Sequence, residues 1–328
     1  MKRARSLPRL LVFVSLLMGC AAVAPDLGPV DGVALRANQA GLRYYSLGQF
    51  GPARSEFERA LRLNRSIDNR EGALGALNNL GAIHLKTGDL PKASLYFSEA
   101  INIAREIPNA TAEIDLLINL GVVSEMKGEP GAAAATYSAA ETLARSAGED
   151  KGLRSALGRL GRLALSQEEW KQAGLYLEEA LRLEREAGNE GGTAARESDL
   201  GMLALHRNHF EDAADRLHSA LGIHRKIQDP QGVALDLQRL AELEVARGDS
   251  EAAEDYARRA LLAHEALNDP TGAFQDLLIL AAIGLEQGDR EKSRKALEKA
   301  GQLIKQIRNA NLRRKWEEIG NSLDKILP

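Results

Sequence analysis

The chain of 328 residues contains a single cysteine, Cys20. A lone cysteine cannot form a disulfide within the chain, and it cannot supply a zinc site built from several cysteines. Long apolar runs are also absent, because beyond the N-terminal stretch no segment is apolar enough for the roughly 20 residues that a membrane-spanning helix needs. The sequence therefore argues against a disulfide-stapled fold and against a protein that crosses a membrane several times.

The N-terminus has the pattern of a secretory signal. Nine uncharged residues, Leu10 to Met18, follow a start that has positive charges and no acidic residue, namely Lys2, Arg3, Arg5 and Arg9. A basic start followed by a short apolar stretch is typical of a signal peptide, and this stretch is too short to span a bilayer.

Cys20 follows directly after Leu17, Met18 and Gly19. An aliphatic residue, a tolerated residue and a small residue before a cysteine resemble the bacterial lipobox, although methionine is a less common occupant of its position. The resemblance implies a signal peptide over residues 1–19, a triacylated Cys20 as the first mature residue, and a lipidated tether over residues 20–32. The alternative is an ordinary signal peptide in which the cysteine has no role.

Removal of the signal leaves 39 basic and 46 acidic residues, a net charge near −7. The mature chain as a whole is therefore mildly acidic, and it has no basic tract that would indicate binding to nucleic acid or to anionic lipid.

Beyond the tether the sequence repeats with a fixed 40-residue period. Small residues form one column, at Gly41, Gly81, Gly121, Gly161, Gly201, Ala241 and Ala281. Alanine forms another, at Ala60, Ala100, Ala140, Ala180, Ala220, Ala260 and Ala300. Between them comes a mostly bulky column, at Phe57, Phe97, Tyr137, Leu177, Leu217, Ala257 and Leu297. A fixed period of this size indicates stacked supersecondary units.

Each unit reads as two helices joined by a short turn. In the second unit Gly88 ends the first helix, and Pro91 stands where a first helical turn tolerates proline. Ala93, Phe97 and Ala100 then share one face of the second helix. Glu168 and Asn208 replace the turn glycine in two units, and we expect the turns between units at Gly72, Gly152, Gly192, Gly232 and Gly272.

These columns resemble the tetratricopeptide repeat, in an extended form whose unit is longer than the usual unit of about 34 residues. The resemblance implies an all-α fold: a right-handed superhelical α-solenoid of seven helix-turn-helix repeats over residues 33–311. Residues 312–328 then predict a C-terminal capping helix, because an apolar stripe follows helical spacing at Leu312, Trp316, Ile319, Leu323 and Ile326.

No stretch of the sequence carries a recognisable catalytic, cofactor or metal motif. His206 and His209 are three residues apart but have no cysteine or clear carboxylate partner, so solvated turn histidines are the better interpretation. We therefore expect a protein that is not an enzyme and binds no cofactor.

In the extended subclass of the repeat family, partners lie in a concave groove lined by the first helices. Asn79 and Asn119 match the groove asparagine that precedes the Leu-Gly pair. Arg159, Asp199 and Arg239 continue the same column, and Arg162 lies one turn further along. These six residues are the predicted partner-binding site, and we expect their side chains to contribute little to stability.

The combined prediction is a lipid-anchored scaffold or adaptor that binds proteins or peptides at the bacterial cell envelope. Ala21 follows the cysteine where aspartate often signals inner-membrane retention, so the outer membrane, facing the periplasm, is favoured. The alternative is a receptor for a small molecule, a peptide or a cell-wall fragment. An enzyme with an unfamiliar site is disfavoured, because the repeats leave no long segment to hold one.

Lipidation of Cys20 is directly testable. The Cys20→Ser variant lacks the thiol that accepts the lipid, so we expect it to lose all label from an alkyne fatty acid supplied to the producing cells. Equal labelling of the wild type and the variant would contradict the prediction.

Overall fold

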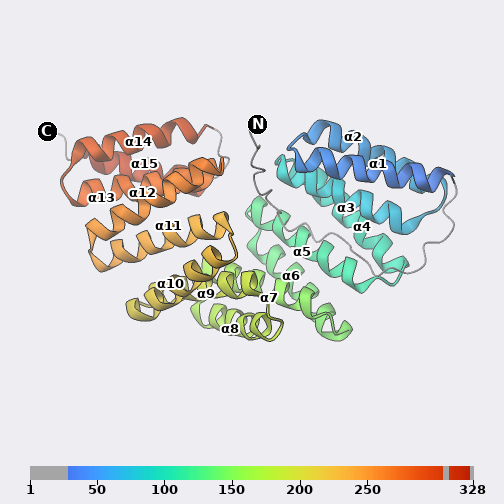
Figure 1. The fold of residues 1–328 in the computed structure, drawn as a ribbon, viewed down its shortest axis with the longest axis horizontal. Coiled ribbons are helices and arrows are strands. Elements are labelled where there is room, and N and C mark those ends of the chain that lie inside the picture. The colour runs from blue at the N-terminus through green and yellow to red at the C-terminus, as the bar shows by residue number, and fades with distance from the viewer. Residues whose placement is uncertain (1–28, 306–309, 326–328) are drawn as a thin grey trace, which may run out of the picture. The chain divides into compact units, whose positions relative to one another are not determined.

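The computed structural model describes residues 29–305 and 310–325, so Cys20 and the predicted signal lie outside the described residues. Within these ranges fifteen α-helices follow one another, and no strand occurs (Figure 1). None of the described helices is both long and apolar enough to cross a membrane. The all-α, helix-turn-helix fold class predicted from the sequence is confirmed.

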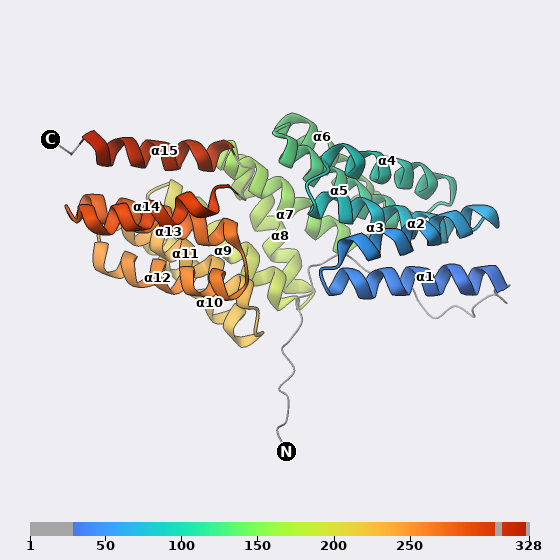
Figure 2. The ribbon, with the colours of Figure 1, turned by 90° about the horizontal axis from the view of Figure 1, so that it is seen from above.

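The helices form seven successive pairs and one extra helix at the end (Figure 2). The first helices of the pairs are α1 (Pro29–Ser46), α3 (Arg70–Lys86), α5 (Ala110–Lys127), α7 (Asp150–Ser166), α9 (Glu190–His206), α11 (Pro230–Arg247) and α13 (Pro270–Glu286). The second helices are α2 (Phe50–Ser66), α4 (Leu90–Glu106), α6 (Pro130–Ala147), α8 (Trp170–Glu186), α10 (Phe210–Lys226), α12 (Ser250–Ala266) and α14 (Arg290–Leu303), and α15 (Ala310–Lys325) follows.

The chain divides into two compact units, and the boundary between Leu160 and Gly161 falls within α7. In the first unit each helix of α1 to α6 packs on the next, and successive first helices also touch. The second unit repeats this arrangement from α8 to α14. The two units are therefore built by the same rule, and each is described by itself below.

Left-handed backbone conformations recur with the 40-residue period. Within the pairs, the turn residues Gly48, Gly88, Gly128, Glu168, Asn208, Gly248 and Gly288 all have positive φ. Glu168 and Asn208 adopt φ of 60° and 58°, so they take the conformation of the glycine that they replace. Such a residue ends a helix by turning the chain while its N–H bonds back to a carbonyl of the last turn.

The small and bulky columns meet inside each pair. A Cβ atom on Gly81 would lie 2.5 Å from Phe97 Cε1, which is far too close for a real contact. Gly121 and Tyr137 repeat this arrangement, and both aromatic side chains are fully buried. The first helix can approach the ring only because it has no side chain there, which explains the small column.

One sequence interpretation is wrong. Gly72, Gly192, Gly232 and Gly272 do not form the turns between units; they lie in the first turn of α3, α9, α11 and α13, and Gly152 lies likewise in α7. A side chain on Gly232 would collide with the His224 ring, and one on Gly272 with the His264 ring. These glycines are needed for close packing between pairs, and the left-handed turn residues precede them by four positions, at Asp68, Gly148, Gly188, Gln228 and Asn268.

The last helix closes the C-terminal end. α15 packs against α13 and α14, and Trp316 and Ile319 join the core cluster of the last pairs. Trp316 Nε1 donates a hydrogen bond to the carbonyl oxygen of Leu297 at 3.1 Å. This packing is that of the predicted capping helix, which covers the apolar side of the last pair.

The alanine column offers a stability test. Ala100 has no exposed surface, so in Ala100→Trp a large ring must enter a packed helix contact. We expect unfolding to become easier by about 1–3 kcal/mol or more, measured by urea denaturation. Ser98→Trp places the same ring on the exposed side of α4 and should be nearly neutral. Equal stability of the two variants would show that the column is not a packing contact.

Candidate binding face

The predicted binding residues lie on the first helices, at or next to the positions where successive first helices bond to one another. We call this surface the first-helix face, and it includes Asn79 on α3, Asn119 on α5, Arg162 on α7, and Asp199 and Arg239 on α9 and α11. Asn79, Asn119 and Arg239 are half-buried, Asp199 is buried, and Arg162 is exposed. Arg159 lies half-buried on α7 and is engaged by other residues.

In the first unit the asparagines bond sideways between first helices. Asn79 Nδ2 donates to Asn38 Oδ1 at 3.0 Å, and Asn119 Nδ2 donates to Asn78 Oδ1 at 3.3 Å. In both bonds the donor and acceptor residues are 41 positions apart in the sequence, so the same contact recurs from one repeat to the next. An asparagine amide has two donor hydrogens and one acceptor oxygen. Each of these bonds uses one donor hydrogen of Asn79 or Asn119, which leaves capacity toward a ligand.

The same column in the second unit carries charge. Arg239 Nη1 donates to Ser198 Oγ at 2.7 Å, and Arg239 Nη2 donates to Asp199 Oδ1 at 3.0 Å. Arg239 therefore makes the sideways link that asparagine makes in the first unit, and it spans the same 40 to 41 residues.

Asp199 is the buried centre of a group of arginines. Its side chain is 3% exposed, and Arg196 Nη2 lies 3.0 Å from Asp199 Oδ2. Burial alone would raise the pKa of Asp199, but Arg196, Arg239 and Arg162 outweigh burial and hold that pKa below its ordinary value. Burial in turn lowers the pKa of Arg196, and Asp199 opposes this shift. Asp199 is thus ionised and paired with arginines. The sequence-based expectation that its side chain contributes little to stability did not foresee this burial.

A second buried pair extends this network. His224 Nδ1 lies 2.6 Å from Asp236 Oδ2, and Asp236 Oδ1 accepts a hydrogen bond from Ser198 Oγ. Serine, histidine and aspartate thus come together, but the serine donates to the carboxylate and not to the imidazole. A nucleophilic serine needs a base that takes its proton, and Ser198 is only 1% exposed. This arrangement links α9, α10 and α11 and does not form a catalytic triad.

The histidine pair occurs twice. His264 Nδ1 lies 2.6 Å from Asp276 Oδ2, in the same positions one period later. Asp276 Oδ1 has no hydrogen-bond partner among the described residues, and Gln238 stands where Ser198, the donor to Asp236 Oδ1, stands one period earlier. Burial raises the pKa of the Asp276 carboxyl, and His264 opposes this rise. Sequence reasoning missed both pairs, although a histidine followed by an aspartate at one fixed spacing recurs with the 40-residue period.

The turn histidines are placed differently from the buried ones. His206 stacks on Trp170 with ring centroids 4.7 Å apart, and His209 precedes α10 in an exposed turn. Among the described residues, no three histidine, cysteine, aspartate or glutamate side chains are grouped so that they could hold a metal ion.

Comparison with known proteins bears on this geometry. Residues 72–146, which span α3 to α6, match the tetratricopeptide repeat model. The fold is a tetratricopeptide-like solenoid. No curated protein sequence matches the chain.

Several solved structures share the fold at low sequence identity. The apo form of RapI is 13% identical with a TM-score of 0.69, over 84% of this chain and 99% of that one. The apo quorum sensor NprR from B. thuringiensis is 14% identical with a TM-score of 0.69, over 83% and 76%. A plasmid's Rap conjugation gene regulator, in complex with the Phr* peptide, is 17% identical with a TM-score of 0.66, over 92% and 81%.

Asp199→Asn tests the buried network. The variant leaves Arg196 and Arg239 without their buried counter-charge, so we expect a loss of about 3–5 kcal/mol in the free energy of unfolding at neutral pH. Arg162→Ala, at the exposed edge of the same group, should change it by less than about 0.5 kcal/mol.

The pH dependence of this loss has a defined sign. The folded-state pKa of Asp199 lies below the ordinary value of 3.8. The charge of Asp199 therefore stabilises the fold above that value, and the contribution disappears as the pH falls through the folded pKa. Urea denaturation of the wild type and Asp199→Asn should show a full difference at neutral pH that narrows only below about pH 3.8. A difference that stays constant into strong acid would contradict this account.

Proposed function

We propose that the protein is a lipid-anchored scaffold or adaptor that binds protein or peptide partners on its first-helix face. The observation that carries this proposal is the recurrence of half-buried polar side chains at one helical position, aligned in register by the repeat. The proposal places the protein in the bacterial cell envelope, held by Cys20, with the outer membrane facing the periplasm as the favoured location.

In the first unit the face suits an extended chain. Asn79 and Asn119 stand at equivalent positions of neighbouring helices, and each keeps an acceptor oxygen and a donor hydrogen beyond its bond to the previous helix. The backbone of an extended peptide presents both donors and acceptors along its length. Amides that repeat in register can therefore bond to a backbone with little regard to its side chains.

In the second unit the first-helix face offers an exposed positive charge. Arg162 is exposed and makes no hydrogen bond or ion pair with other described residues. Its guanidinium can accept a carboxylate of a partner in two parallel hydrogen bonds. Asp199 and Arg239, in contrast, are committed to each other, so we assign them to positioning the face rather than to contacting a partner.

Structures of the same fold support peptide binding. One Rap protein was solved in complex with Competence and Sporulation Factor, and the Rap conjugation gene regulator was solved with the Phr* peptide. The quorum sensor NprR shares the fold as well, which favours the second candidate function, a receptor that responds to a small peptide ligand. Both functions use the same face, and they differ in whether the ligand is a protein partner or a free signal.

Binding can be tested with variants matched to controls on the second helices. Asn79→Ala with Asn119→Ala removes the amides of the first unit, and Arg162→Ala removes the cation of the second. Each truncation should weaken binding by about 1–3 kcal/mol where a partner group is left unsatisfied. The measurement is crosslinking in envelopes followed by pull-down and mass spectrometry.

The controls carry the same chemical changes on α4 and α8. Asn102→Ala and Arg182→Ala replace exposed residues of second helices, so they should recover the same partners as the wild type. All variants should melt near the wild-type temperature. If the first-helix variants recover every partner as well as the controls do, the first-helix face is not the binding surface.

A further inference from the structure

The first helix of the chain differs from the later first helices at one buried position. One period after Arg43 and at each further period stands a buried apolar residue, namely Ile83, Val123, Leu163, Leu203, Leu243 and Ile283. Arg43 itself is exposed. The position is buried in later pairs because an earlier second helix covers it, and among the described residues no helix precedes α1.

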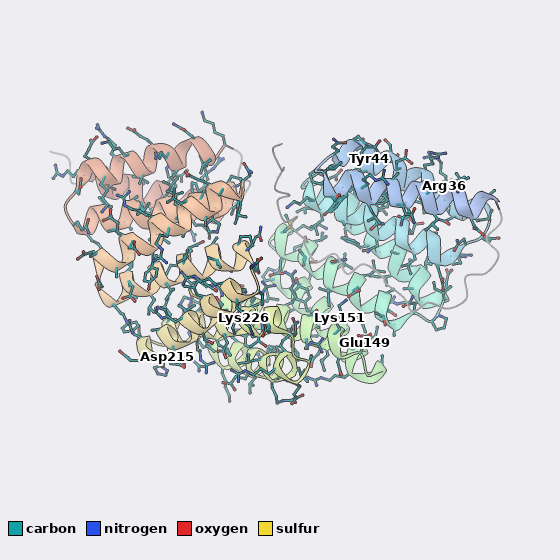
Figure 3. All side chains as sticks on the ribbon, viewed as in Figure 1. Arg36, Tyr44, Glu149, Lys151, Asp215 and Lys226 are labelled. Carbon is teal, nitrogen blue, oxygen red and sulfur yellow. The ribbon has the colours of Figure 1, made fainter. Side chains whose placement is uncertain are left out.

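Two more positions on the same side of α1 show the same change. The counterparts of Arg36 are all buried, at Ala76, Leu116, Ala156, Arg196, Asp236 and Asp276, whereas Arg36 is exposed. Tyr44 is 36% exposed, whereas its counterparts in α3 to α13 are buried. We call Arg36, Arg43 and Tyr44 the end face; Arg36 and Tyr44 are labelled on α1 in Figure 3.

The first pair carries a net positive charge. Residues 29–66, which form α1 and α2, contain six arginines and three acidic residues, a net charge of +3. Residues 67–328 contain 33 basic and 42 acidic residues, a net charge of −9. The acidic balance of the whole chain therefore hides a basic N-terminal pair. Residues 290–328, which include α14 and α15, are basic as well, with 11 basic and 5 acidic residues.

The arginines of the end face are available. Within α2, Arg54 lies 3.8 Å from Glu58 and Arg59 lies 3.6 Å from Glu56, and Arg65 pairs with Glu99 of α4, so three of the six arginines have acidic partners. Arg36 and Arg43 make no side-chain hydrogen bond or ion pair with any described residue. Among the described residues, no acceptor is therefore bonded to either guanidinium group.

The basic end lies next to the predicted anchor. Eight residues, 21–28, separate Cys20 from the start of α1 at Pro29. A fully extended chain spans at most about 3.6 Å per residue, so this segment reaches about 30 Å. If Cys20 carries the lipid, Pro29 at the start of α1 cannot lie further than this from the membrane surface.

We propose that the end face docks on anionic phospholipid headgroups beside the lipid anchor. This inference rests on the lipidation of Cys20 given under the proposed function. Arg36 and Arg43 supply forked donors that match phosphate oxygens, and tyrosine is a residue favoured at membrane–water interfaces. A basic patch next to an acyl anchor is the combination that strengthens membrane binding. Residues 67–289, which contain 22 basic and 37 acidic residues, are repelled by the same surface.

The test uses the full lipidated protein on vesicles of phosphatidylcholine alone and of phosphatidylcholine mixed with phosphatidylglycerol. A fluorescent label at Gln39→Cys sits on α1 one turn from both arginines, and the acylated Cys20 does not react with the label. A quencher on the lipid headgroups reports closeness. We expect severalfold stronger quenching on the mixed vesicles, reduced to the phosphatidylcholine level by Arg36→Glu with Arg43→Glu and by high salt.

The matched control is Arg225→Glu with Arg290→Glu, which makes the same charge change at two exposed arginines of the second unit. The control should keep the strong quenching on mixed vesicles. Equal quenching on both vesicle types, or quenching that survives in the Arg36 and Arg43 variant, overturns the end-face proposal. Failure of the protein to sediment with either vesicle type instead refutes the lipid anchor itself.

Discussion

The contact between a glycine on one helix and a bulky side chain on the next lets the two helices come close in five of the seven pairs of this protein. Gly81 lets α3 approach the ring of Phe97, and Gly201 does the same for Leu217. Where the glycine becomes Ala241, the bulky residue becomes Ala257, and both lie in one core cluster. Total volume at the contact is thus kept low enough for the helices to stay close, as dense core packing requires. Because the spacing within pairs is constant, the pairs can stack with one period.

Contacts between pairs are far less uniform than contacts within them. Position 104 and its partner position 116 are alanine and leucine, and both are buried. One period later the positions hold two alanines, then Glu184 with Arg196, then His224 with Asp236. The same slot therefore holds apolar side chains at two places of the first unit, Asn64 opposite Ala76 at a third, and ionisable side chains in the second unit. A buried charge is tolerated only beside its own partner, so the charged slots specify which pair stacks on which.

This difference between the units carries over to their surfaces. The Asn79 and Asn119 amides link neighbouring helices and still keep a donor hydrogen and an acceptor oxygen for a ligand. Arg239 and Asp199, in contrast, bond to each other. On equivalent faces, the first unit therefore presents the amides of Asn79 and Asn119, and the second presents the exposed guanidinium of Arg162 beside the Asp199–Arg239 pair. A basic first pair and a helical cap at the C-terminal end close the two ends in different ways. At the C-terminal end, α15 covers the last pair through apolar contacts. In the first described pair, exposed arginines stand at positions that are buried in later pairs.

The 40-residue period, the helix pairs, the turns within pairs and the capping helix followed from the sequence alone, because each depends on residues close together in the chain. Glu168 and Asn208 were recognised as turn residues for the same reason, since φ at a helix end is a local property. The tertiary structure decided what lies between pairs. Gly72 and Gly232 looked like turn residues, yet each is needed by a side chain of the preceding helix. Asp199 looked like an exposed groove residue, yet it is buried among arginines from neighbouring helices. The burial of a polar residue depends on partners a full repeat away in the chain, and a repeat pattern gives the position of such a partner but not whether the two side chains satisfy each other.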